Sequence, residues 1–248
     1  MLIEPEEING ATIYLGDSLN ILPTLNTRVD AVITDPPYSA FRQGAGSNST
    51  KRYFRDCSAS AAALPPIEGE SMDQHAYMNW TRWWMGLCRR VLNPGGILLA
   101  FTNHSMIVPT VDGMQQAGLM YRGIFVWHKP NHRPQLNRYT NACEFAVWGT
   151  EGDRGPDGKP VKGFFSKSPR AMTHRSHQNE KPRELMDHLI SITRPGETIL
   201  DPFMGSGSTL LSAVAARRKA IGIEASEEIY QIARRRLQQC QTQLELDV

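Results

Sequence analysis

The chain has 248 residues, 40% of them hydrophobic and 21% charged, and its formal net charge is +2. These values are ordinary for a globular protein, and the length suits one domain with an insertion or two. No apolar run reaches membrane-spanning length, no basic-then-apolar leader opens the chain, and the four cysteines lack the paired spacing of a zinc site. We therefore expect a cytoplasmic protein with no membrane span and no bound metal.

The first predicted strand spans residues 11–15 and ends at Gly16 and Asp17. A leucine-rich helical turn follows it. Asp17 therefore stands at the carboxyl end of a strand, where open α/β sheets bind their ligands. The alternative is that Asp17 only caps the helical turn, a role for which aspartate is among the preferred residues.

The second predicted strand, residues 29–34, is a nearly continuous apolar run of the kind found in strands buried on both faces. It stops at Asp35, Pro36, Pro37 and Tyr38. The prolines have a fixed φ and no N–H group, so a carboxylate and a free carbonyl are held at the strand's carboxyl end. These acceptors suit the two N–H bonds of an amino group on a planar ring, on which Tyr38 would stack. The alternative is a stiff turn without chemistry.

Residues 39–72 change in character: they are first basic and rich in glycine and serine, then rich in alanine, serine and proline. A loop of this length in a compact domain is usually functional or disordered. Because it begins directly after Tyr38, it is either a mobile flap over the site or a plain insert.

The remainder of the chain alternates helices with strands. We predict strands over residues 97–101, 124–127, 144–148, 197–200 and 220–223, and helices over 73–92, about 105–117, from Pro182, up to Arg217 and from Ser226. Trp80 and Trp84 fall on the apolar stripe of their helix and are assigned to packing. The strands at 124–127 and 144–148 resemble an antiparallel hairpin at a sheet edge. The Arg234-Arg235-Arg236 run of the last helix is assigned to solvated surface.

Residues 129–177 are loop-like and basic. They contain nine lysines and arginines against four aspartates and glutamates, a surplus of five positive charges in a chain whose total is +2. This clustering concentrates positive field where a polyanion such as nucleic acid could bind. The alternative is an ordinary solvated loop.

A strand, a glycine turn and a helix follow one another near the end of the chain. The strand at 197–200 leads into Asp201, and Gly205-Ser206-Gly207 then opens a helix, where glycines let the backbone approach a ligand closely. The next strand ends in Glu224, about twenty residues on, the offset at which such folds bind ribose hydroxyls. No third glycine and no Lys-Ser/Thr pair follow, so a nucleoside without phosphates fits best, and Asp201 favours a cation. S-adenosylmethionine is such a ligand.

Together these two sites match a known family. The chain resembles the β-class DNA amino-methyltransferases, which modify the N6 amine of adenine or the N4 amine of cytosine. In that class the catalytic Asp-Pro-Pro-Tyr precedes the cofactor-binding Phe-x-Gly-x-Gly, and both are intact here, as Asp35–Tyr38 and Phe203–Gly207. The family's His-Pro-Thr-Gln-Lys-Pro segment reads His177-Gln178-Asn179-Glu180-Lys181-Pro182, which keeps only the His, the Lys and the final Pro. The resemblance spans residues 11–38 and about 73–240.

The strand order and this resemblance together imply an α/β fold with a Rossmann-like, doubly wound, mostly parallel sheet. We expect seven strands, an antiparallel edge hairpin and a circularly permuted motif order, with Asp35 and Gly205 ending neighbouring strands at one edge. The chain would form a single methyltransferase domain over residues 1–248. It would carry a flexible catalytic-side loop at about 39–72 and a small basic target-recognition insert at about 129–177.

The resemblance also implies residue roles and partners. Catalysis is assigned to Asp35, Pro36, Pro37 and Tyr38. Cofactor binding is assigned to Asp17, Asn179, Lys181, Asp201, Phe203, Gly205, Ser206, Gly207 and Glu224. DNA binding is assigned to Arg42, Lys51, Arg52, Arg133, Arg138, Lys167 and Arg170. The expected cofactor is S-adenosylmethionine, and the expected partner is double-stranded DNA, in a bacterial or phage-type restriction–modification setting. The short insert also suggests a homodimer.

The expected mechanism places the two N–H bonds of the target amine on Asp35 and on the carbonyl of Pro36, so that the nitrogen lone pair faces the sulfonium methyl. The base must be flipped out of the duplex to reach them. Aspartate at the first motif position favours adenine N6, because serine is commoner there in cytosine-N4 enzymes. The alternatives are cytosine-N4 methylation, a non-catalytic DNA-binding relative, and methylation of RNA or of a protein glutamine, whose enzymes typically have Asn in place of Asp35.

Overall fold

The computed structural model describes residues 4–37, 72–131, 136–137, 139–156, 158–168 and 181–246. Within them, nine strands form one sheet in the order β1-β2-β9-β8-β3-β4-β6-β5-β7. The strands are β1 (Glu6–Ile8), β2 (Ala11–Leu15), β3 (Val29–Thr34), β4 (Leu92–Thr102), β5 (Met120–His128), β6 (Cys143–Thr150), β7 (Phe164–Ser166), β8 (Thr198–Asp201) and β9 (Lys219–Glu224). The helices are α1 (Ser18–Ile21), the 3-10 turn η1 (Leu22–Thr24), α3 (Gln74–Val91), α4 (Ile107–Gln116), α5 (Arg183–Ile190), α6 (Ser208–Ala215) and α7 (Glu227–Leu246).

The predicted number of seven strands is wrong, because one short strand is added at each side of the sheet. β1 pairs antiparallel with β2, and β7 pairs parallel with β5. β7 also covers the outer side of the β5–β6 hairpin, which therefore is not the last pair of the sheet. Each added strand has only three residues. Such strands form by pairing with an existing edge rather than through a hydrophobic pattern of their own, so the sequence gives little sign of them.

The sheet is mostly parallel, as expected. β2, β9, β8, β3 and β4 are parallel neighbours, and β6 is antiparallel to both β4 and β5. Since β4 and β5 are both antiparallel to β6, they run in the same direction. The carboxyl ends of six strands therefore point to one edge of the sheet: β2, β3, β4, β5, β8 and β9. The first residues of β6 reach the same edge.

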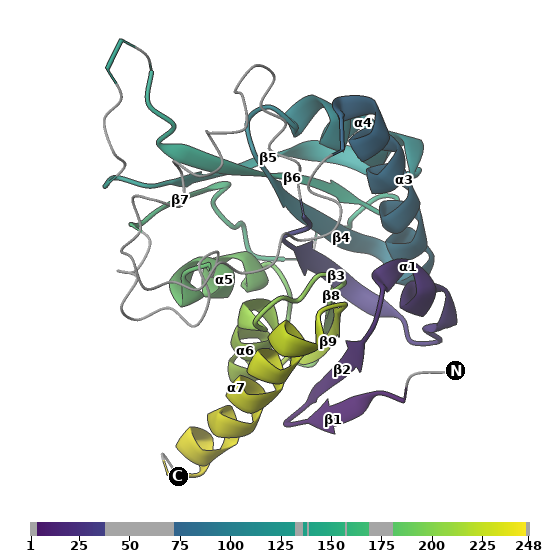
Figure 1. Cartoon of the computed structure of the whole chain (residues 1–248), viewed down its shortest axis with the longest axis vertical. Coiled ribbons are helices and arrows are strands. Elements are labelled where there is room, and N and C mark those ends of the chain that lie inside the picture. Colours follow the sequence, from purple (N-terminus) through teal and green to yellow (C-terminus); the bar gives the residue numbers. More distant parts are fainter. Residues whose placement is uncertain are drawn as a thin grey trace.

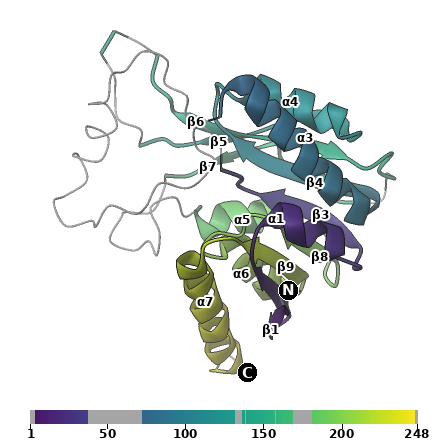
Figure 2. The same cartoon turned by 45° about the vertical axis from the view of Figure 1, so that its right-hand side comes forward.

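Helices cover both faces of the sheet, which gives the doubly wound architecture (Figures 1 and 2). The α5, α6 and α7 side packs on Ala31 and Ile33 of β3, and the α1, α3 and α4 side packs on Val32. The central strand is thus buried on both faces, as its apolar run predicts. No helix among the described residues combines the length and the apolar character needed to cross a membrane.

α3 begins and ends close to the predicted bounds. Its N-cap is Asp73, whose side chain accepts a hydrogen bond from Ala76 N at 2.8 Å. Trp84 is fully buried, and Trp80 packs partly buried against the same core, so the assignment of these two side chains to packing is confirmed. The adjacent Trp83 is 68% exposed.

Candidate active site

Four acidic residues from four parallel strands lie at the carboxyl edge of the sheet. Asp35 directly follows β3, Asp201 ends β8, Glu224 ends β9, and Asp17 follows β2. β3 pairs with β8, and β9 lies between β8 and β2. The predicted adjacency of the Asp35 tetrapeptide and the glycine turn is therefore confirmed.

Asp35 presents its two carboxylate oxygens to different surroundings. Oδ2 lies 2.7 Å from the Nζ atom of Lys181, whose side chain is only 9% exposed. Oδ1 is buried and has no hydrogen-bond partner among the described residues. Burial raises the pKa of Asp35, the charge of Lys181 partly offsets that rise, and the nearby charge of Glu144 adds to it. One oxygen is thus occupied by a cation while the other is available as an acceptor.

Glu144, the second residue of β6, also lies at this site and is not among the predicted site residues. Its Oε2 atom lies 3.2 Å from Lys181 Nζ, and its Oε1 atom is paired with Lys129, the residue after β5. Burial opposes the charge of Glu144, but the two lysines outweigh burial and lower its pKa. The available signal was a lone acid at the start of an otherwise apolar strand. The pairing of β6 with the end of β4 brings that acid to the site edge.

Lys181, which is predicted to bind the cofactor, contacts the carboxylate of Asp35 through its ammonium. Besides Asp35 and Glu144, the Nζ atom lies 4.8 Å from the centre of the Phe101 ring. The residue precedes α5 and lies on the side of the sheet that α5, α6 and α7 cover. A cation in this position compensates the carboxylates that the fold buries around it.

Asp201 connects the two predicted sites. Its Oδ1 atom accepts hydrogen bonds from Thr34 Oγ1 at 2.7 Å and from Phe203 N at 3.1 Å. Burial raises the pKa of Asp201 to about 6, the hydrogen bonds limit that rise, and the charge of Asp35 contributes to it. Asp201 thereby holds the end of β3 and the start of the glycine turn together.

The glycine turn has the geometry of a ligand-approaching loop. Gly205 and Gly207 adopt φ values of +52° and +83°, which L side chains rarely take. A Cβ atom built on Gly205 meets nothing within 4 Å, so the space beside this backbone is open. Glu224 accepts hydrogen bonds from Gly205 N at 3.1 Å and from Ser226 N at 2.8 Å, and its carboxylate retains lone pairs for a ribose. Burial raises its pKa, and these backbone bonds offset part of the rise. The residues therefore fit a nucleoside cofactor.

Two other residues assigned to the cofactor have their side chains engaged elsewhere. Arg236 Nη1 donates to the carbonyl of Ser206 at 2.7 Å and to its Oγ atom at 2.9 Å. The ring of Phe203 meets Trp84 edge-on at 5.3 Å and Trp80 at 5.4 Å. The turn is thus held from outside by α7 and α3. The prediction that the whole Arg234–Arg236 run is solvated surface is wrong, because Arg236 contacts the turn and Arg234 pairs with Glu6 at 2.7 Å.

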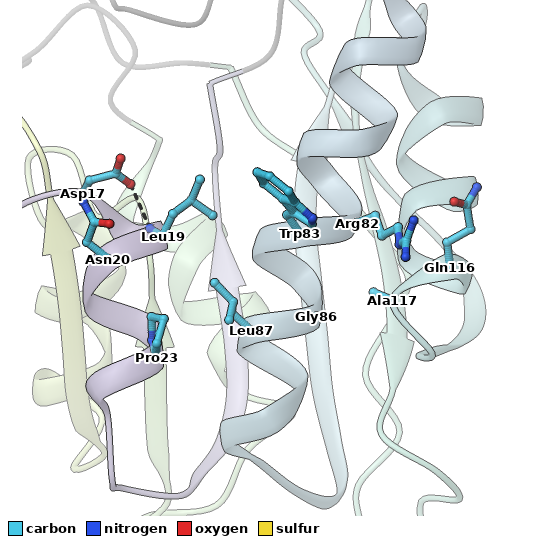
Figure 3. A pocket seen from close by; sticks show the side chains of 10 residues that line it. All are labelled: Asp17, Leu19, Asn20, Pro23, Arg82, Trp83, Gly86, Leu87, Gln116 and Ala117. Atoms are coloured by element: carbon cyan, nitrogen blue, oxygen red, sulfur yellow. Dashed lines mark hydrogen bonds between the residues drawn. The ribbon is translucent and has the colours of Figure 1, made fainter.

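Asp17 is exposed and caps α1, accepting a hydrogen bond from Leu19 N at 2.8 Å. Asp17 therefore caps the helical turn, and the cap uses one of its two carboxylate oxygens. A groove of about 640 Å³ lies between α1 and α3, and Asp17 is one of the residues that line it. Figure 3 shows Asp17 at one end of these lining residues. Among the predicted site residues that the structure describes, Asp17 alone lines this groove, which therefore touches the edge with the four acids only at Asp17.

Only one of the predicted DNA-binding residues belongs to the described part of the chain. Lys167 follows β7 at the same sheet edge and forms an ion pair with Glu184 at 2.7 Å. The predicted site residues that lie outside the described part of the chain are Tyr38, Asn179, Arg42, Lys51, Arg52, Arg133, Arg138 and Arg170.

Known proteins share both the sequence and the fold. Residues 29–235 match the N6/N4 methyltransferase family model, described as DNA methylase. The type II methyltransferase M2.DpnII of Streptococcus pneumoniae is 28% identical over 229 residues, covering 85% of this chain and 82% of that protein. The crystal structure of the M1.HpyAVI–SAM complex matches with a TM-score of 0.66 at 27% identity, over 92% of this chain and 98% of that one. The cytosine-N4-specific PvuII DNA methyltransferase shares the fold, with a TM-score of 0.68 at 19% identity over 90% of this chain and 85% of that one.

The family match covers most of the chain and includes both motif regions. The fold, the edge that collects the motif residues, and the open turn at Gly205 agree with it. The chain therefore belongs to the N6/N4 DNA methylase family and is an S-adenosylmethionine-dependent DNA amino-methyltransferase.

Proposed function

We propose that this enzyme methylates the N6 amino group of an adenine that is flipped out of double-stranded DNA. The observation that carries the proposal is Asp35 Oδ1, a buried carboxylate oxygen without a hydrogen-bond partner among the described residues. A buried acceptor of this kind is costly unless a ligand completes it. The amine of the target base supplies the missing donor.

The amine needs this help because its lone pair is delocalised into the ring. Asp35 Oδ1 accepts a hydrogen bond from one N–H group of the amine. Pro36 has no backbone N–H group, and its carbonyl accepts a hydrogen bond from the other. The nitrogen then becomes tetrahedral, and its lone pair points at the methyl group. Alignment of two reactants in this way is worth about 7–11 kcal/mol of barrier in favourable cases. Tyr38 stacks on the flipped base.

The cofactor lies beside the glycine turn in this proposal. Bound S-adenosylmethionine supplies an electrophilic methyl group. The backbone at Gly205 leaves room for it, Glu224 binds its ribose, Asp17 meets its adenine end and Asp201 faces its cationic side. The whole chain acts as one methyltransferase domain, with residues 39–72 as a loop on the catalytic side.

Adenine is preferred over cytosine because aspartate stands first in Asp35–Tyr38. Cytosine-N4 methylation is the second candidate, since the family model covers both reactions and the PvuII enzyme of the same fold is cytosine-N4-specific. The two are separated by mass spectrometry of nucleosides from DNA of cells expressing the chain. N6-methyladenine supports the proposal, and N4-methylcytosine alone overturns the choice of base. Mapping the modified positions gives the recognition sequence.

DNA binding is assigned to the basic insert at about 129–177. Charge reversal at Arg133, Arg138 and Arg170 should weaken DNA binding and flatten its salt dependence, because each lost phosphate contact lowers the slope by about one. Asp35→Ala should do the opposite and reduce methyl transfer while most DNA affinity remains. Single-turnover transfer is measured beside DNA binding at two salt concentrations. If Asp35→Ala transfers methyl groups at the wild-type rate, the tetrapeptide is only a stiff turn without a chemical role. A wild-type protein that binds DNA without transferring methyl groups would be a non-catalytic relative.

A further inference from the structure

Four charged side chains of alternating sign form a row at the active-site edge. Asp35 contacts Lys181 at 2.7 Å, Lys181 contacts Glu144 at 3.2 Å, and Glu144 pairs with Lys129. They come from four separate places in the chain: after β3, before α5, at the start of β6 and after β5. The row is neutral overall, and no member is more than 29% exposed.

The position of Lys181 depends on more than its bond to Asp35. An ammonium on a flexible side chain takes many positions unless several partners fix it. Here one carboxylate contacts it on each side, and the ring of Phe101 lies beneath it at 4.8 Å. Glu144 is in turn neutralised by Lys129, whose ammonium lies 4.7 Å from the centre of the Trp127 ring. Within the described part of the chain, Glu144 therefore joins the two lysines.

We propose that Glu144 is a positioning residue for methyl transfer, holding the Lys181 ammonium on Oδ2 of Asp35 so that Oδ1 stays open to the target amine. This inference rests on the proposed role of Asp35 as the amine acceptor. With Oδ2 occupied, the carboxylate stays ionised and keeps one orientation. If Lys181 moves away, the buried Asp35 gains a proton more easily, and a protonated carboxyl is a poorer acceptor.

The titratable groups that face Asp35 allow a sharp test of this role. They are Lys181, Glu144, Lys129, Asp201 on β8 and Tyr77 on α3. Through space, the negative charge of Glu144 raises the pKa of Asp35. If Glu144 acted only by its charge, its removal would shift the acid limb of the activity profile to lower pH. If it positions Lys181, its removal frees the cation and shifts that limb to higher pH.

The experiment compares Glu144→Ala and Glu144→Gln with the wild type. Glu151→Ala is the matched control, because Glu151 directly follows β6 at its opposite end and pairs with Arg89 at the surface. Transfer of labelled methyl groups from S-adenosylmethionine to genomic DNA from a methylation-deficient bacterium is followed under single-turnover conditions between about pH 5 and 9. Cofactor affinity is measured by calorimetry on the same samples.

Glu144→Ala should slow transfer about tenfold near neutral pH and move the acid limb up by about one pH unit, with little change in cofactor affinity. Glu144→Gln keeps a carbonyl acceptor for Lys181 and should recover part of the rate, with a smaller upward shift. The Glu151→Ala control should match the wild type. A downward shift or an unchanged limb in Glu144→Ala overturns the positioning role.

Two further variants keep the test decisive. If Glu144→Ala does not fold, Lys181→Met must shift the limb upward. Adding Glu144→Gln to it must cause no further upward shift, because the positioning contact is already lost and only the through-space effect of Glu144 remains, whose removal lowers the pKa of Asp35. A further upward shift on adding Glu144→Gln overturns the proposal. Asp35→Ala distinguishes a failure of the proposed function from a failure of the positioning role of Glu144. If Asp35→Ala transfers methyl groups at the wild-type rate, the proposed function fails. If it is inactive while the Glu144 variants behave as wild type, only the positioning role fails.

Discussion

Thr34 Oγ1 lies 2.7 Å from Asp201 Oδ1, and this one hydrogen bond joins the end of β3 to the end of β8. The strand that leads into the proposed catalytic tetrapeptide, Asp35–Tyr38, is thereby fixed against the strand that leads into the glycine turn proposed to bind the cofactor. Methyl transfer needs two reactants aligned within a few tenths of an ångström. A buried contact between the two strand ends provides that alignment without involving either reactant.

The raised pKa of Asp201 predicts a pH-dependent stability. Its value is about 6 in the folded protein, and aspartate titrates near 4 in an unfolded chain. Between these values the folded protein retains a proton that the unfolded chain has released, so stability falls as pH rises from about 4 to 6. The full effect is about 3 kcal/mol. Urea denaturation at stepped pH should show this fall in the wild type and a flatter profile in Asp201→Asn. An equally steep profile in the variant would contradict the assignment.

The cofactor site predicts a loss of S-adenosylmethionine binding when Gly207 is replaced. Gly207→Val places a branched side chain at φ +83° and 3.2 Å from the Cβ atom of Ala233, which strains the turn. Glu224→Ala removes the acceptor of Gly205 N and the proposed ribose contact. Calorimetry should find affinity weakened about tenfold or more in both variants. Wild-type affinity in both would remove the cofactor from this turn.

Arg236 is expected to support the same turn from outside. Arg236→Gln loses the hydrogen bonds to both oxygens of Ser206 and should weaken cofactor binding several-fold, while methyl transfer at saturating cofactor changes little. Arg235→Gln is the control, because Arg235 is exposed and its guanidinium bonds a backbone carbonyl of its own helix. Equal cofactor affinities in the two variants would show that the contact between Arg236 and Ser206 has no role in cofactor binding.

Truncation of the two adjacent tryptophans on α3 should reduce the stability of the fold by very different amounts. Trp84 is fully buried and meets the ring of Phe203 edge-on, so Trp84→Ala should cost about 3–5 kcal/mol of stability. Trp83 is 68% exposed, and Trp83→Ala should change stability by less than about 0.5 kcal/mol. Thermal and chemical unfolding compare them. Comparable losses would place Trp83 in an interface that the isolated chain does not show.

Assembly is a separate prediction. The basic insert is short for an enzyme that must hold a duplex and flip a base, so we expect an isologous homodimer that extends the basic surface. Light scattering should give a dimer mass for the free protein or for its DNA complex. A monomer in both states would contradict this.

The sequence alone predicted the longer strands and helices and the identity of both motifs, because these depend on local patterns. An apolar run such as 29–34 has to be a buried strand, Pro36 and Pro37 end it, and Gly205 and Gly207 allow the tight turn. The order of strands and motifs then predicted a doubly wound sheet. The short strands β1 and β7 escaped prediction, because their stability comes from a neighbouring edge rather than from their own residues.

Only the tertiary structure decided which charges meet. Asp35 and Lys181 are far apart in the sequence, and Glu144 looked like an ordinary acid at the start of a strand. The antiparallel pairing of β6 with β4 brings Glu144 to the edge where β3 ends, and burial there makes each charge require a partner. For the same reason Lys181 contacts a carboxylate, and Arg236 contacts the glycine turn instead of lying on open surface. Pairing of charges follows from three-dimensional proximity and desolvation, and neither is written in the local pattern of residues.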